Sequence, residues 1–257
     1  MSSRSPILEL KGIRKKFGGV NAVDGVSLDI RQGGVYGLIG PNGSGKSTLF
    51  NLVSGLLQPD AGEIRFEGRR IDGLPIRKIF ELGISRSFQI PRLFFGMTVF
   101  DNLMCAPKGQ TGESPISALR SEKWHVQEQV FARSMQALLD ELEISGAYLN
   151  PASEISGGQM KLLQLAIALA TEPKLLLLDE PTAGVAPRIA QDIFLAIEEQ
   201  RRRTGTTFFI IEHRLDILLE KVDHVFVMHQ GKLISEGRPE QVTQDKRVIE
   251  AYLGISG

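Results

Sequence analysis

The chain has 257 residues, of which 42% are hydrophobic and 23% charged, and its 30 basic and 30 acidic side chains give a formal net charge of +0. This composition excludes an intrinsically disordered chain and provides no overall basic charge for nucleic acid, so we expect no nucleic-acid partner. The single cysteine, Cys105, excludes an internal disulfide and is typical of a reducing compartment. The longest apolar runs are far shorter than the ~20 residues of a membrane span, and no signal-peptide core is visible.

The apolar pattern predicts an α/β fold with two kinds of strand. Alternating apolar and polar residues at 7–18 and 62–68 indicate half-exposed strands of an antiparallel layer. Continuous apolar runs that end in turn residues indicate buried, largely parallel strands at 35–40, 174–179, 207–212 and 224–228.

The middle of the chain has helical periodicity. Apolar residues recur there at spacings of three and four, which predicts an amphipathic helix over 119–144. The predicted apolar face consists of Val130, Phe131, Met135, Leu138, Leu139 and Leu142. We therefore predict one domain over 1–257, in which a helical subdomain at 89–156 is inserted into a core formed by 1–88 and 157–257.

A glycine-rich turn, GPNGSGKST at 40–48, joins the strand predicted at 35–40 to a helical pattern. This context is typical of a loop that surrounds phosphate groups, because glycines allow the backbone N–H groups to approach an anion closely. Lys46 would add a full positive charge near the β- and γ-phosphates, and the Ser47 hydroxyl can bind Mg²⁺. The sequence thus predicts a nucleoside triphosphate site made by Gly40, Pro41, Asn42, Gly43, Ser44, Gly45, Lys46, Ser47 and Thr48.

Two consecutive carboxylates, Asp179 and Glu180, end the apolar strand in KLLLLDEPT. A buried strand should not end in charge unless a partner compensates it, and phosphate-bound Mg²⁺ would do so. We assign Asp179 to the metal and Glu180 to orienting or deprotonating the attacking water. The alternative is a pair of surface acids at a strand end.

A second glycine-rich turn, ISGGQ at 155–159, precedes an apolar helical pattern, and Ser156 is predicted to cap that helix. A structural helix start explains these residues equally well when they are taken alone. His213 follows the strand predicted at 207–212, where a histidine is more commonly a solvated loop residue than a catalytic group. Gln89 carries little information by itself.

Taken together and in this order, GPNGSGKST, Gln89, ISGGQ, LLLLDE and His213 resemble the ATPase domain of the ATP-binding cassette family over nearly the whole chain. The resemblance implies a P-loop core with an antiparallel β layer and an inserted helical subdomain. It also implies ATP and Mg²⁺ as ligands and hydrolysis of ATP. By position, Phe17 is similar to the aromatic residue that stacks on adenine, and Val23 falls among the nucleotide-binding residues. Gln89 would contact Mg²⁺, and His213 would touch the γ-phosphate as a second catalytic residue.

The same resemblance gives a reason for the second glycine-rich turn. In this family two ATPase domains stack head to tail, and the turn of each closes over the ATP in the P-loop of the other. The residues that would act in this way are Ser156, Gly157, Gly158 and Gln159. The partner would be a second ATPase subunit, either an identical copy or a related chain.

Three positions depart from the commonest family pattern: Ile155 replaces leucine, Ile167 replaces arginine, and the loop TAGVAP at 182–187 lacks the usual aspartate, with Ala186 in its place. The phrases RSFQIPRLFFGMTVFDNL, AGVAP, IIEHRLDILL and VIEAYLG resemble those of ATPase subunits of branched-chain amino-acid importers. This likeness implies two membrane permease subunits, an external solute-binding protein, and a peripheral place on the cytoplasmic face of the inner membrane. Importers for urea, amides or other small solutes are an alternative, and a soluble ATPase of the same fold is a more distant one.

The stretch QIPRLFFGMTVF also has two interpretations. Its apolar residues Ile90, Leu93, Phe94 and Phe95 would suit a groove for a short helix of the membrane partner. Interior packing of the helical insertion explains them about equally well.

Overall fold

The structure, a computed structural model, describes residues 6–87, 93–110 and 121–253. Its strands form two sheets. The first is antiparallel, in the order β2-β1-β4-β5, and consists of Pro6–Phe17 (β1), Val20–Arg31 (β2), Ala61–Phe66 (β4) and Arg69–Arg70 (β5). The second runs β10-β9-β3-β8-β7-β6 and consists of Val35–Ile39 (β3), Ile84–Arg86 (β6), Leu175–Asp179 (β7), Thr207–Ile211 (β8), His224–His229 (β9) and Lys232–Gly237 (β10).

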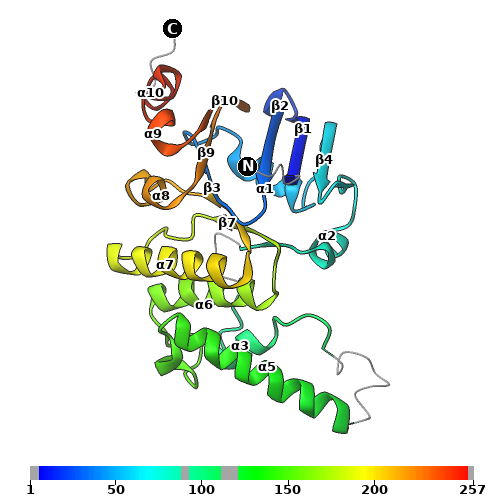
Figure 1. Cartoon of the computed structure of the whole chain (residues 1–257), viewed down its shortest axis with the longest axis vertical. Coiled ribbons are helices and arrows are strands. Elements are labelled where there is room, and N and C mark those ends of the chain that lie inside the picture. The colour runs from blue at the N-terminus through cyan, green and yellow to red at the C-terminus, as the bar shows by residue number, and fades with distance from the viewer. Residues whose placement is uncertain (1–5, 88–92, 111–120, 254–257) are drawn as a thin grey trace.

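Strand pairing confirms the expected fold class. In the second, larger sheet, five strands are parallel to one another: β9, β3, β8, β7 and β6. In this sheet only β10 runs antiparallel to its neighbour. The antiparallel layer lies beside this sheet and is seen at the upper right of Figure 1. Every strand predicted from the sequence is present, whereas β2, β5, β6 and β10 were not predicted.

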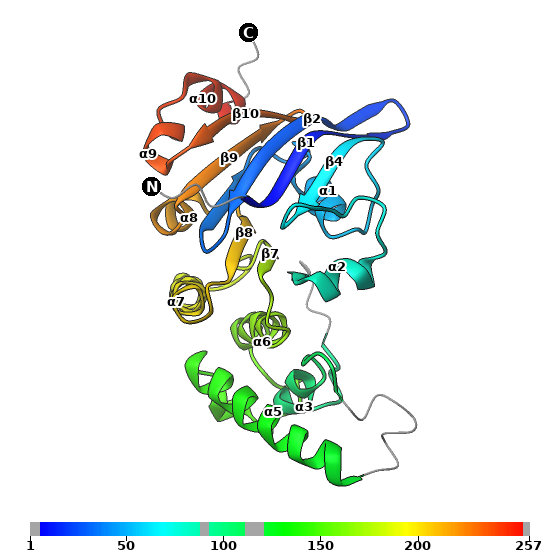
Figure 2. The same ribbon diagram turned by 45° about the vertical axis from the view of Figure 1, so that its right-hand side comes forward.

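The helices cover the larger sheet and extend away from it. They are Lys46–Val53 (α1), Ile76–Leu82 (α2), Val99–Met104 (α3), Ser121–Glu141 (α5), the 3-10 turn Ser145–Ala147 (η2), Gly157–Ala170 (α6), Pro187–Thr204 (α7), Leu215–Lys221 (α8), Pro239–Val242 (α9) and Lys246–Leu253 (α10). Figures 1 and 2 show α7, α6 and α5 in succession away from the sheet, with α5 and α10 at opposite ends of the long axis. Among the described helices, none is both long and apolar enough to cross a bilayer.

Two hydrophobic cores lie on the two faces of the larger sheet. Side chains along a strand alternate between its faces, so Leu175 and Leu177 of β7 pack toward α1 and the antiparallel layer. Leu176 and Leu178 point the other way, into a core shared with α6, α7 and α8. Burial on both faces explains why β7 reads as an unbroken apolar run.

The helical segment packs against α6 through the second core. Met135, Leu138, Leu139 and Leu142 are buried there as predicted, but Val130 is 57% exposed, so its assignment to the apolar face was wrong. Phe131 is partly buried. Figure 2 shows that α5 extends beyond α6, so part of its length has no neighbouring helix to cover it. The boundaries at 88/89 and 156/157 stay a prediction.

Candidate nucleotide-binding site

A cavity of about 430 Å³ lies where β3, β7 and β8 end. Neighbouring parallel strands have their carboxyl ends at one edge of a sheet, and the strand order places β8 between β3 and β7. The segments that follow these three strands therefore converge. The cavity is lined by Val20, Asn21, Ala22, residues 42–48, Glu180, His213 and Gln230.

Two glycines of the loop after β3, Gly40 and Gly45, are required because other backbone segments approach them closely. A Cβ atom at Gly40 would lie 2.0 Å from the Met228 carbonyl oxygen, and one at Gly45 would lie 2.2 Å from the Ala22 carbonyl oxygen. Both residues also have positive φ angles, 149° and 103°, which favour glycine. The loop thus lies between Met228 of β9 and Ala22 of β2, with no room for a side chain at either glycine.

Lys46, the first residue of α1, folds back over this loop. Its Nζ donates to the carbonyl oxygens of Gly40 at 2.7 Å and Pro41 at 3.0 Å. Burial lowers the pKa of Lys46, and the nearby carboxylates of Glu180 and Asp179 act in the opposite direction. An ammonium held among carbonyl oxygens at a helix N-terminus is suited to receiving phosphate oxygens in their place.

The start of α1 adds to this positive character. Gly45 is the N-cap and offers no side chain to the first backbone N–H groups, and the first turn contains no acidic residue. The partial positive charge of the helix N-terminus is therefore directed at the cavity.

Asp179, the last residue of β7, is buried and forms an ion pair with Arg86 of β6, with 2.9 Å between Oδ2 and Nη2. The same guanidinium donates to Asn51 of α1 and to Ser54, the residue that caps the end of α1. Arg86 thus connects the carboxylate predicted to bind metal with the helix that follows the phosphate loop. Sequence reasoning missed this residue, and its only signal was an arginine at the end of a short apolar stretch.

Glu180 and His213 meet at the edge of the cavity. His213 Nε2 lies 3.0 Å from Glu180 Oε1. Glu180 has a φ of 51°, a left-handed conformation that is uncommon for a residue with a side chain and that occurs often at functional sites. Its backbone N–H donates to the Ile211 carbonyl oxygen at 2.9 Å, which ties the turn after β7 to the end of β8.

Other predicted site residues lie in different surroundings. Phe17 is 47% exposed, with the Lys15 ammonium 5.7 Å from its ring centre. Val23 is buried in the core beneath the antiparallel layer, and among the described residues the cavity is lined by its neighbours 20–22 instead. The side chain of Val23 faces inward because residues alternate along β2. Gln89 lies outside the described residues.

The turn at 155–159 forms a capping box at the start of α6. Ser156 Oγ accepts from the Gln159 backbone N–H at 3.2 Å, and Gln159 Oε1 accepts from the Ser156 backbone N–H at 2.9 Å. Ser156 and Gly157 are exposed, and no described atom would contact a Cβ at Gly157. Among the described residues, this turn does not line the cavity of its own chain.

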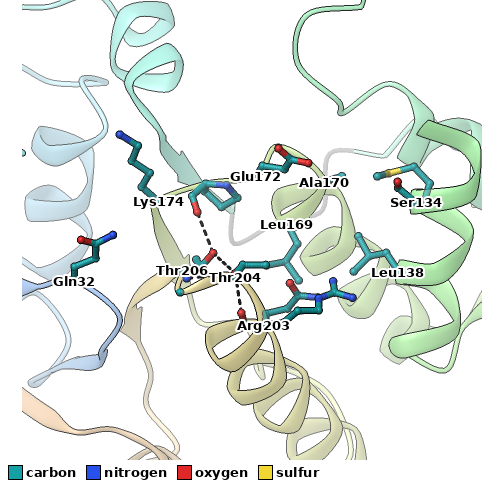
Figure 3. Close-up of a pocket in the computed structure, with 14 residues that line it drawn as sticks. Gln32, Ser134, Leu138, Leu169, Ala170, Glu172, Lys174, Arg203, Thr204 and Thr206 are labelled. Atoms are coloured by element: carbon teal, nitrogen blue, oxygen red, sulfur yellow. Dashed lines mark hydrogen bonds between the residues drawn. The ribbon is translucent and has the colours of Figure 1, made fainter. Parts of the chain in front are cut away.

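A second cavity of about 390 Å³ lies at the opposite ends of β7 and β8, between α5, α6 and α7 (Figure 3). Two threonine hydroxyl groups of this cavity are engaged in internal hydrogen bonds. Thr204 Oγ1 bonds to Thr206 Oγ1 at 2.8 Å and to the Gln200 carbonyl oxygen at 2.7 Å, and Thr206 Oγ1 donates to the Pro173 carbonyl oxygen at 3.0 Å. These bonds join the segments that precede β7 and β8. We place the nucleotide site at the other edge of the sheet, because the phosphate loop, Glu180 and His213 line the cavity there.

This fold and site define an ATP-binding cassette protein, and the chain belongs to the ABC transporter family, whose members hydrolyse ATP: residues 23–183 match the family model described as ABC transporter. Residues 232–256 match a second model, described as branched-chain amino acid ATP-binding cassette transporter. The predicted family and ATPase class are thereby confirmed.

Relatives that match nearly the whole chain indicate which branch of the ABC transporter family it is similar to. The chain is 43% identical to the probable branched-chain amino acid transport ATP-binding protein LivG of Methanocaldococcus jannaschii, over 99% of this chain and 100% of that protein. It is 36% identical to the high-affinity branched-chain amino acid transport ATP-binding protein BraF of Pseudomonas aeruginosa, over 97% of this chain and 98% of that protein. A crystal structure of the ADP conformation of an ATP-binding cassette of an ABC transporter is 42% identical, with a TM-score of 0.83, and the match covers 98% of this chain and 100% of that one.

Proposed function

We propose that the chain is the ATP-hydrolysing subunit of an importer for branched-chain amino acids. It would act as a peripheral subunit on the cytoplasmic face of the membrane, with two permease subunits, a second ATPase subunit and an external solute-binding protein. The observation that carries the proposal is the cavity that joins the phosphate loop to Glu180 and His213, on a chain matched end to end by proteins named for this transport. Importers of urea, amides or other small solutes remain the second candidate.

The phosphate loop holds the ATP phosphates in this proposal. Backbone N–H groups of residues 42–47 surround them, and Lys46 exchanges its bonds to loop carbonyl oxygens for bonds to phosphate oxygens. Phe17 is exposed and pairs across the β1–β2 hairpin with Val20, which lines the cavity, and it would stack on adenine.

The residues present fit Mg²⁺. The Ser47 hydroxyl and the Asp179 carboxylate are oxygen donors, which this hard cation prefers, and Gln89 is the third proposed ligand. When bound, Mg²⁺ neutralises charge on the phosphates. Asp179 is rigidly placed for this role, because it ends a strand that is buried on both faces.

Glu180 activates the attacking water by accepting its proton. His213 orients the Glu180 carboxylate and the γ-phosphate. With Nε2 3.0 Å from the Glu180 carboxylate, the imidazole limits the motion of that side chain and lies at the edge where the γ-phosphate would sit. The left-handed turn at Glu180 directs the carboxylate into the cavity rather than along the strand.

The turn at 155–159 acts on the ATP of the second ATPase subunit. Exposure of Ser156 and Gly157, and the absence of this turn among the described residues lining its own cavity, support action in trans. A helix N-terminus with no acidic residue in its first turn attracts a phosphate. Binding of ATP would close the two domains, and hydrolysis would reopen them.

The surface for the permease includes Phe94 and Phe95. Their side chains are 60% and 50% exposed, whereas Leu93 is buried in the core, so the predicted groove is divided between surface and interior. Ile90 lies outside the described residues. Asn102 fixes the backbone of this turn, since it accepts from the Phe94 N–H at 2.8 Å and donates to the Phe94 carbonyl oxygen at 3.0 Å. Two exposed phenyl rings on a turn whose backbone is held by Asn102 suit an apolar partner.

We expect Phe94→Asp and Phe95→Asp to abolish solute uptake while ATP hydrolysis continues, because a carboxylate at this position would have to be desolvated on docking. Transport and ATPase activity are measured together in membrane vesicles. Leu195→Asp, at an equally exposed apolar position on α7, is the matched control and should retain uptake. Normal uptake by both phenylalanine variants would contradict the docking surface.

Identification of co-purifying proteins tests the function itself. The chain is tagged in its native cell, membranes are extracted gently, and the bound proteins are identified by mass spectrometry. The proposal predicts two multi-span proteins, a second ATPase and an amino-acid-binding protein. Recovery of ribosomal or DNA-repair proteins without a membrane protein would instead indicate a soluble ATPase.

A further inference from the structure

The side chain of Glu212 is buried at the end of β8, with 2% of the residue exposed, and sits between the two catalytic segments. Its Oε1 accepts two hydrogen bonds from Thr182, one from the backbone N–H and one from the hydroxyl, both at 2.7 Å. Its Oε2 accepts from the backbone N–H of His213 at 3.1 Å. One carboxylate thus binds the turn after β7 and the turn after β8 at the same time.

These contacts complete a ring of interactions. Thr182 is two residues beyond Glu180, and His213 directly follows Glu212. The side chains of Glu180 and His213 meet at 3.0 Å on the cavity side, while Glu212 joins the bases of the same two turns. A shift of Thr182 therefore cannot occur without a change in the position of His213 or the loss of a buried hydrogen bond.

The strength of this connection follows from burial. A carboxylate removed from water is tolerated when several donors satisfy it, and hydrogen bonds to a charged acceptor are stronger than those between neutral groups. Nearby, Lys161 of α6 places Nζ 3.5 Å from the Glu180 carbonyl oxygen, and Glu212 contributes to the electrostatic field at that ammonium. The helix that begins with the 155–159 turn therefore also contacts this ring.

We propose that Glu212 is a positioning residue for ATP hydrolysis: its carboxylate holds the Thr182 turn against the His213 turn so that Glu180 and His213 stay in register. This inference rests on the proposed function. It assigns to Glu212 the coupling of the turn after β7 to the turn after β8.

Thr182→Val tests the proposal with little change of shape, because it removes the hydroxyl bond and keeps the backbone bond. We expect kcat to fall about tenfold, the effect of losing one hydrogen bond to a charged group, while KM for ATP and the affinity for ADP stay within about twofold. Thr182→Ser keeps the hydroxyl and should restore most of kcat. Both variants are measured in the purified chain with its co-purifying partners, together with thermal unfolding.

Glu212→Gln gives a second, independent measurement. An amide retains an acceptor toward one turn but presents N–H donors to the other, so kcat should fall at least as far as in Thr182→Val. A wild-type kcat in Thr182→Val, with only a lower unfolding temperature, would overturn the positioning role. A wild-type preparation without ATPase activity would contradict the proposed function instead, so the two failures are distinguishable.

Discussion

Glu180→Gln is expected to lower the rate of ATP hydrolysis by about 10²–10⁴-fold while ATP binding is retained. The amide has nearly the shape of the carboxylate but cannot accept the proton of the attacking water. The P-loop contacts of Lys46 do not involve this side chain, so affinity for ATP should change little. Glu143→Gln is a suitable control, because Glu143 is an exposed glutamate with a positive φ of 56° outside the cavity.

A consequence of this variant is an ATP-dependent dimer. If closure in trans is correct, slow hydrolysis should trap two ATPase domains together, and light scattering should show a doubled mass in ATP and Mg²⁺ but not in ADP. A wild-type turnover rate in Glu180→Gln would remove Glu180 from the chemistry. A monomer in ATP, both for the chain alone and in the presence of its related ATPase, would contradict closure through the 155–159 turn.

Arg86→Met is expected to destabilise the nucleotide-free protein by about 3–5 kcal/mol. The substitution leaves the buried Asp179 carboxylate without its cation, and α1 loses the bonds from Arg86 to Asn51 and Ser54. Mg²⁺ with ADP should raise the unfolding temperature of this variant more than that of the wild type, because the metal supplies positive charge at the same carboxylate.

Two controls separate charge from packing in this experiment. Arg202→Met breaks an exposed ion pair on α7, which should change stability by no more than about 1 kcal/mol. Asp179→Asn combined with Arg86→Met removes both charges and should recover part of the lost stability. If Arg86→Met unfolds at the wild-type temperature, the ion pair does not hold β6, β7 and α1 together.

The parts of the fold that were predictable are those with a strong local pattern. β3, β7, β8 and β9 are buried on both faces and read as continuous apolar runs. β6 has only three residues and β10 is mostly half-exposed, so neither has a long pattern of its own. β6 pairs with β7, which is distant from it in the sequence, and β10 pairs with β9. Neither pairing is visible in the residue pattern of the short strand itself.

The site divides in the same way. Gly40 and Lys46 were predictable, because a glycine-rich loop between a strand and a helix has a fixed spacing. Asp179 was predictable because it is a carboxylate at the end of a continuous apolar run. Glu212 and Arg86 were not predictable, since each acts through partners that only the folded sheet brings near: Thr182 is 30 residues from Glu212, and Asp179 is 93 residues from Arg86. Sequence alone also could not separate a capping role from an in-trans role for Ser156.

Uptake of labelled solute in cells that lack this gene tests the central claim most directly. The proposal predicts that deletion abolishes high-affinity uptake of leucine, isoleucine and valine, that the wild-type chain restores it, and that Glu180→Gln does not. Unchanged uptake of these three amino acids after deletion, with loss of urea or amide uptake, would contradict the assignment to a branched-chain amino-acid importer.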